Sequence, residues 1–72
     1  MTIPPDPESM NDSRSEWAAE ALSRFESVTS APPEDLLTDL LKNLMHWCDR
    51  NDVDFNDELA AARLHYEAET DA

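Results

Sequence analysis

The sequence contains no glycine and only one cysteine, and both facts narrow the possible folds. Tight hairpin turns and phosphate-binding loops depend on glycine, because only glycine readily adopts the positive φ angles that they need. With Cys48 alone, an intramolecular disulfide cannot form, so a disulfide-stabilised secreted scaffold is excluded. These absences favour helices joined by turns of proline, asparagine and aspartate.

Basic residues and long apolar runs are also scarce. Five Lys and Arg stand against 17 Asp and Glu, so the formal net charge of the 72 residues is −12, beyond the magnitude of about 2 to 8 usual for a small domain. No run approaches the ~18 apolar residues of a membrane-spanning helix. The first residues, MTIPPDPESMND, lack the basic start and apolar centre of a signal peptide. We therefore expect a cytoplasmic protein that avoids nucleic acid and membranes and prefers basic partners.

The apolar residues that are present suffice to order part of the chain. They make up 40% of the sequence and include eight leucines and two tryptophans. A domain of this size, however, buries only about 60% of the surface that its unfolded form exposes. Disulfides, metals or partners usually supply the missing stability. We therefore expect self-association as a homodimer.

Hydrophobic periodicity predicts an all-α fold: a short three-helix bundle, or a helical hairpin plus an N-terminal helix, over residues 12–72. Residues 1–11 hold three of the five prolines and are predicted to form a flexible tail. Ser13–Glu16 has the spacing of a capping box, so the first helix is expected to follow it and to end near Ser27. Its apolar stripe comprises Trp17, Ala18, Ala21, Leu22, Phe25 and Val28.

The second helix is predicted to begin near Pro33 and to end around Asp49–Asn51, since proline suits a first helical turn and Asn and Asp favour turns. Its apolar residues cover more than one narrow stripe, as in a central helix with neighbours on two sides. One of these sides is a candidate subunit interface. The candidate interface residues are Leu37, Leu40, Leu41, Leu44 and Trp47.

A third helix is predicted from Phe55 to about Glu69, with Asp54 as its N-cap. Its apolar residues at helical spacing are Phe55, Leu59, Ala62 and Tyr66, with Leu64 and Ala68 expected nearby.

The acidic stretch between the second and third helices invites comparison with a calcium-binding EF-hand loop. Asp52, Asp54 and Asn56 would fill its first, third and fifth positions. The sixth position would then hold Asp57 in place of glycine, and the twelfth would hold Arg63 in place of glutamate. Because a cation at the twelfth position defeats calcium binding, we interpret the stretch as a capped turn.

Zinc and catalytic sites are also not supported. His46 and Cys48 are two residues apart and therefore lie on different faces of a helix. His65–Glu67 matches the H-x-E fragment of zinc deaminases, but the downstream cysteine pair is missing. Cys48 lies on the apolar side of the second helix and is interpreted as a small hydrophobic residue, not a nucleophile. We predict no metal, no cofactor and no enzymatic activity.

The acidic pairs at i, i+4 spacing do not match the E-x-x-E and E-x-x-D patterns of magnesium-dependent all-α nucleotide pyrophosphatases. A nucleotide hydrolase is therefore only a third hypothesis.

Carboxylates three or four residues apart on a helix lie about 5–6 Å from each other. This distance is similar in scale to the spacing of phosphates along a nucleic-acid groove. We therefore predict that carboxylates bind Arg and Lys on a basic protein surface. The predicted partner-binding residues are Glu16, Glu20, Asp35, Asp39, Asp49, Asp52, Asp54, Asp57 and Glu58.

The segment DLLTDLLKNLMHWCDRNDVDFNDELAAARLHYEAE, about half of the chain, is similar to a helical segment in small uncharacterised proteins of bacterial mobile elements and phages. The resemblance is carried by LMHWCDRN, DF and A-R-x-H-Y-E-A-E, and it implies no known activity. In size, charge and helicity, though not in motif, the chain also resembles the small acidic anti-CRISPR and anti-restriction DNA mimics of phages.

Two functional hypotheses follow. In the preferred one, the protein is a small acidic helical inhibitor. It binds the basic nucleic-acid-binding surface of a host defence or nucleic-acid-handling protein, without binding nucleic acid itself. In the alternative, it is a non-enzymatic oligomerisation or assembly module whose acidity serves solubility.

Overall fold

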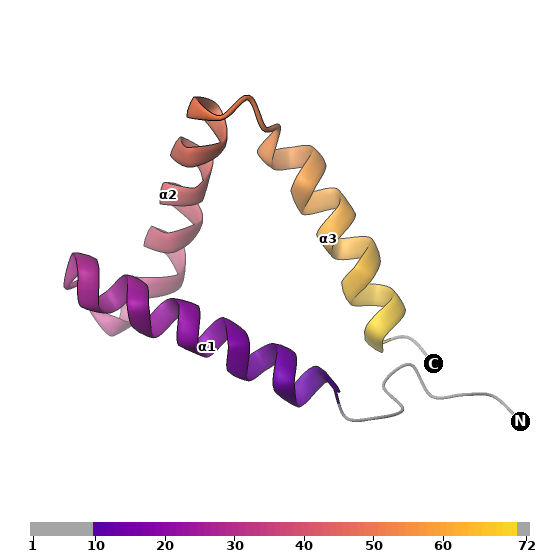
Figure 1. The fold of residues 1–72 in the computed structure, drawn as a ribbon, viewed down its shortest axis with the longest axis horizontal. Coiled ribbons are helices and arrows are strands. Elements are labelled where there is room, and N and C mark those ends of the chain that lie inside the picture. Colours follow the sequence, from indigo (N-terminus) through magenta and orange to yellow (C-terminus); the bar gives the residue numbers. More distant parts are fainter. Residues whose placement is uncertain (1–9, 71–72) are drawn as a thin grey trace, which may run out of the picture.

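Three helices follow one another along the sides of an open triangle in the computed structural model (Figure 1). The structure describes residues 10–70, so most of the predicted tail lies outside the described residues. Helix α1 spans Met10–Thr29, α2 spans Leu36–Arg50 and α3 spans Phe55–Thr70, while a short 3₁₀ turn, η1, covers Pro33–Asp35. Residues 10–70 contain no strand, and the predicted all-α fold is confirmed.

Helix α1 begins at Met10, earlier than its capping-box spacing predicts. Ser13 therefore lies inside the first turn, and its prediction as the start of the helix is wrong. The side chain of Asn11 donates a hydrogen bond of 2.9 Å to the carbonyl of Glu69 in α3. This tertiary contact lies within the extra turn of α1, and a local capping pattern cannot reveal it.

The connection between α1 and α2 combines a left-handed residue with two prolines. Ser30 adopts a φ of 58°, and its N–H still donates to the carbonyl of Glu26 at 2.8 Å. Pro32 and Pro33 then prevent the helix from continuing. The chain restarts through η1, where the N–H of Asp35 donates to the Pro32 carbonyl at 3.0 Å. The predicted break and restart are confirmed.

The turn between α2 and α3 is closed by hydrogen bonds to one carbonyl. That carbonyl belongs to Cys48 and accepts from the N–H of Asn51 at 3.2 Å and from the N–H of Val53 at 3.0 Å. Asp52, between them, adopts a φ of 56°, a conformation that aspartate tolerates better than most residues. Asn and Asp thus take the place of glycine in this turn.

Asp54 caps α3 as predicted. Its Oδ1 accepts a hydrogen bond of 3.0 Å from the N–H of Asp57, three residues later. The apolar line that begins at Phe55 follows, but Leu64 is not part of it. Five residues from Leu59 correspond to about 140° around the helix, and Leu64 is 69% exposed. The expectation that Leu64 lies near the line is wrong.

The three helices touch mainly where consecutive helices meet. Helices α1 and α2 are in contact at their shared corner. The half-buried apolar residues of these two helices include Leu22 and Phe25 of α1 and Leu36 and Leu40 of α2. Among residues 10–70, only Cys48, at 6% exposure, is buried. The described residues therefore lack the shared core that three packed helices usually enclose.

The N-cap at Asp54 can be tested by substitution. We expect Asp54→Ala to destabilise the protein by about 1 kcal/mol, because the α3 N-terminus loses its side-chain acceptor, whereas Asp54→Asn retains one. Thermal unfolding followed by circular dichroism measures both. Equal melting temperatures for the alanine and asparagine variants would contradict this role.

Candidate functional site: an open apolar face

One side of α2 is apolar and carries no charge. At 100° per residue, this arc covers about 160° of the helix surface. Its members are Leu37, Leu40, Leu41, Leu44, Met45, Trp47 and Cys48. The charged residues of α2 lie on the remaining side, where Lys42 Nζ approaches Asp39 Oδ1 at 3.8 Å. Helix α2 is therefore strongly amphipathic.

Most of this arc is not covered by the rest of the molecule. Leu40 is half-buried, and Cys48, near the end of α2 that meets α3, is buried. The other members stay exposed: Leu37 at 59%, Trp47 at 57%, Met45 at 50%, Leu41 at 42% and Leu44 at 41%. Four of the five predicted interface residues are thus exposed, and Leu40 is the exception.

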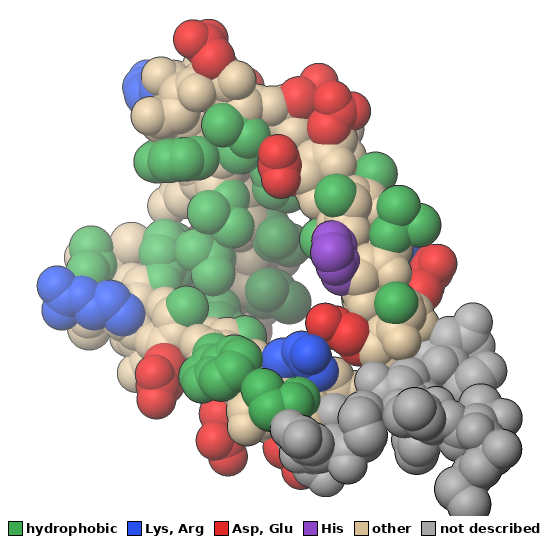
Figure 2. Space-filling model, turned by 45° about the vertical axis from the view of Figure 1, so that its right-hand side comes forward, with side chains coloured by type: hydrophobic (Ala, Val, Ile, Leu, Met, Phe, Trp, Pro, Cys, Tyr) green, Lys and Arg blue, Asp and Glu red, His purple; other side chains and the backbone are tan. Residues whose placement is uncertain are grey.

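Exposed apolar residues also occur on the other two helices. Trp17 follows Arg14 by three residues, on the same side of α1, and remains 57% exposed. On α3, Leu59 and Tyr66 line a shallow hollow with Ala62, and they are 47% and 63% exposed. Figure 2 shows hydrophobic side chains gathered over this inner side of the triangle. We call this surface the open apolar face and define it as Trp17, Leu37, Leu41, Leu44, Leu59 and Tyr66.

The ends of α1 and α3 are joined by a small polar cluster, which we call the clasp and define as Asn11, Arg14 and Glu69. Arg14 Nε lies 3.2 Å from Glu69 Oε2, and Arg14 Nη1 donates to Asn11 Oδ1 at 2.9 Å. The side chains of Arg14 and Glu69 keep 38% and 33% of their surface exposed. Exposed ion pairs contribute at most about 1 kcal/mol, so the triangle is closed weakly at this corner.

The predicted partner-binding carboxylates of α1 lie away from the open apolar face. Glu16 and Glu20 are about 160° and 120° around the helix from Arg14, which reaches α3. Both side chains are exposed. They therefore form a short acidic row on the outer side of α1. Figure 2 shows acidic side chains along the lower edge of the molecule.

A second acidic cluster lies at the α2–α3 corner. Asp49 and Asp54 line one shallow hollow there, together with Met45 and Phe55. The remaining acids of this corner are Asp52, Asp57 and Glu58. One oxygen of Asp54 already accepts the capping hydrogen bond. Figure 2 shows one group of acidic side chains at the top of the molecule and another along its lower edge.

Asp35 and Asp39 lie near the start of α2 and belong to neither cluster. Asp39 is half-buried and next to Lys42, so part of its charge is already balanced. The nine predicted carboxylates thus occupy three separate places and do not form one continuous row.

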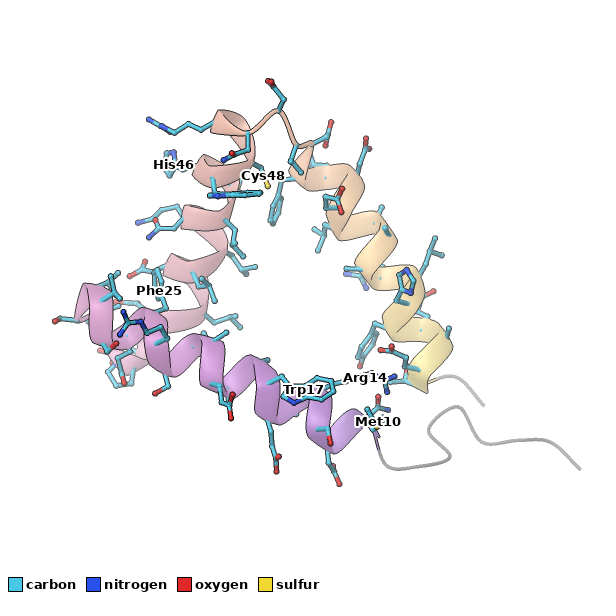
Figure 3. All side chains as sticks on the ribbon, in the orientation of Figure 1. Met10, Arg14, Trp17, Phe25, His46 and Cys48 are labelled. Carbon is cyan, nitrogen blue, oxygen red and sulfur yellow. The ribbon has the colours of Figure 1, made fainter. Side chains whose placement is uncertain are left out.

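The described residues hold no cluster of metal-ligating side chains. Within residues 10–70, no three His, Cys, Asp or Glu side chains lie close enough together to hold a metal ion. Figure 3 shows Cys48 on the inner side of α2 and His46 on its outer side, so these two residues do not form a nucleophile–base pair.

No known protein family, curated protein or solved structure matches the chain. Along residues 10–70, no helix combines the length and the apolar character that crossing a bilayer requires. The open apolar face and the two acidic clusters are therefore the features from which function has to be inferred.

The clasp is the part of this arrangement that sequence analysis missed. Asn11 and Glu69 are 58 residues apart in the chain, and a single sequence contains no signal that pairs them. Trp17 and Tyr66 are recognisable as members of helical stripes, but the stripes alone do not show that both remain exposed.

The clasp can be tested by removing one partner at a time. We expect Glu69→Ala to accelerate amide hydrogen exchange in the first two turns of α1 and the last turn of α3, because the ion pair between Arg14 and Glu69 is lost and only the hydrogen bond from Asn11 to the carbonyl of residue 69 still joins the two ends. The matched control is Glu67→Ala, which changes an exposed glutamate of the same helix. In this control, the exchange rates measured by NMR should equal those of the wild type. Equal exchange rates in both variants would show that the clasp does not hold the corner.

Proposed function

We propose that this protein is a non-enzymatic helical interaction module and that another protein surface covers its open apolar face. The observation that carries the proposal is the exposure of this face, whose members keep between 41% and 63% of their surface. Single apolar residues are common on protein surfaces, but a contiguous apolar patch marks an interaction site. This is the assembly-module hypothesis of the sequence analysis.

The energetics support such a role. Complete burial of a leucine side chain is worth about 1.5–3 kcal/mol relative to its exposure. Within one chain, only part of this stabilisation is gained, because three leucines of α2 are only partly buried: Leu37, Leu41 and Leu44. A partner that covers them supplies the remainder, and so binding and stabilisation of the fold are coupled. We place the module in the cytoplasm, where the single thiol of Cys48 remains reduced.

A second candidate function is supported by the acidic corner between α2 and α3. The carboxylates of this corner can bind Arg and Lys of a basic protein surface. They belong to Asp49, Asp52, Asp57 and Glu58. In this function, the protein inhibits a nucleic-acid-handling protein, as anti-CRISPR and DNA-mimic proteins do. The two functions are compatible, because the acidic clusters lie outside the open apolar face.

The first function is tested with two variants that carry the same chemical change. We expect Leu41→Asp to lose the proteins captured by the wild-type chain from a host lysate, because a carboxylate is placed within the open apolar face. Leu64→Asp adds the same charge on the other side of α3, where the side chain is 69% exposed, and should retain them. Quantitative mass spectrometry of the captured proteins compares both variants with the wild type. If Leu41→Asp leaves both this capture and the self-association of the chain unchanged, the proposal is refuted.

The second function is tested by neutralising the acidic corner. We expect the triple variant Asp49→Asn, Asp57→Asn and Glu58→Gln to lose basic partners, and we expect wild-type binding to weaken steeply as sodium chloride rises. Asp54 is left unchanged so that the cap of α3 persists. Neutralising Glu26, Glu34 and Glu67, which are exposed and are not among the predicted partner-binding residues, removes the same number of charges elsewhere and serves as the control. If both triple variants bind equally, the corner has no specific role.

A further inference from the structure

We infer that the partner on the open apolar face is a second copy of this chain, with the two α2 helices at the centre of a two-fold dimer. The inference rests on the proposed function, in which a protein surface covers this face. The inference specifies which protein provides that surface, and it specifies α2 as the helix that makes the central contact.

The size of the face fits a dimer. Taking ~180 Å² for a leucine and ~250 Å² for an aromatic side chain, the exposed fractions of the six face residues amount to about 600 Å² per chain. Two copies then bury about 1,200 Å² in total, which is the lower limit of a standard specific interface. Met45 and Trp47, at the edges of the same arc, raise the total to about 1,700 Å². The exposed apolar area is therefore sufficient for a stable dimer.

The spacing of the α2 residues suits helix–helix packing. Leu37, Leu41 and Leu44 are separated by four and then three residues, the alternation seen along the seam between two packed helices. In an interface with two-fold symmetry, the same patch occurs on both sides. A helix whose seam consists of leucines is complementary to its own copy, because each leucine can insert between those of the other helix.

The distribution of charge favours a copy of this chain over a strongly basic partner. The arc of about 160° on α2 contains no charged residue. A basic surface placed on it would bury cations without any carboxylate to pair them, and this is costly. A second copy brings another uncharged arc, and its acidic row and acidic corner remain on the outer side. The net charge of −12 on each chain still opposes association at long range.

Because of this repulsion, the affinity between the two copies should increase with salt concentration. Salt screens charges that lie more than about 8–10 Å apart at physiological ionic strength. We therefore expect the dimer to become tighter as sodium chloride rises from ~0.05 to ~0.5 M. A complex held by a basic partner shows the opposite trend, because its attraction is screened.

Analytical ultracentrifugation of the full chain tests the inference. We expect a monomer–dimer equilibrium that shifts to dimer with salt. Leu41→Asp should weaken it by about 100-fold or more, since each dimer loses two central leucines. Leu37→Asp, at a position that is 59% exposed, is a second variant with little risk to the fold of the chain. Leu64→Asp should dimerise as the wild type does, and circular dichroism confirms that all the chains remain helical.

Cross-linking tests the position of α2. In a Cys48→Ala chain, we expect Leu41→Cys to form covalent dimers with a short thiol cross-linker, because the two copies of residue 41 meet near the two-fold axis. His46→Cys, on the outer side of α2 in Figure 3, should not do so. Dimers that form without cross-linking at residue 41 would overturn the central position of α2.

The possible failures can be told apart. A chain that stays monomeric at every salt concentration overturns the second copy as the partner. If Leu41→Asp still abolishes capture from lysate in that case, the proposed function stands with a different protein on the face. If Leu41→Asp changes neither self-association nor capture, both the inference and the proposed function are wrong.

Discussion

The structure depends on one constraint: α2 has an apolar arc wider than its two neighbours can cover. Helix α1 lies at one edge of this arc, and α3 meets one end of it at Cys48, the single buried residue among those described. Hydrophobic stabilisation scales with the apolar area removed from water, so a single chain gains little of it. Most of the stability of a helix in a protein comes from the packing of its apolar side, which here stays largely exposed. The fold of one chain therefore relies on caps, turns and the clasp until something covers the arc.

Local patterns in the sequence predict that there are three helices and where α2 and α3 begin and end, because local interactions determine these ends. Pro32 and Pro33 interrupt the backbone hydrogen bonds in any context, and Asp54 caps α3 through a contact three residues away. The start of α1 was predicted incorrectly because Asn11 and Arg14 interact with Glu69 at the far end of the chain. Periodicity identifies the apolar side of each helix. It does not specify the angles between helices, and so the open triangle could not be foreseen.

In the candidate site, too, local features could be predicted from the sequence, whereas the arrangement of residues from different helices could not. Leu37, Leu41 and Leu44 were recognisable as an interface because they lie on one side of a helix with too many apolar residues for a single neighbour. Carboxylates at i, i+4 spacing suggested rows, but each row extends only along its own helix. The corner between α2 and α3 instead gathers Asp49 and Asp54 from two sides of a turn. Which acidic residues act together is decided by the turn and not by the spacing within one helix.

Acidity and apolar surface have complementary roles in this molecule. An exposed apolar face of this size would promote unlimited association if apolar residues also covered the remaining sides. Glu16 and Glu20 on the outer side of α1 and the acidic corner make those other contacts repulsive between copies. Association is thereby restricted to the one uncharged arc. A two-fold contact through that arc buries the same patch on both copies, so no third chain can bind there and the assembly is a dimer. In the dimer that we propose, the high negative charge thus limits the size of the assembly, and it leaves carboxylates on the outside of the dimer.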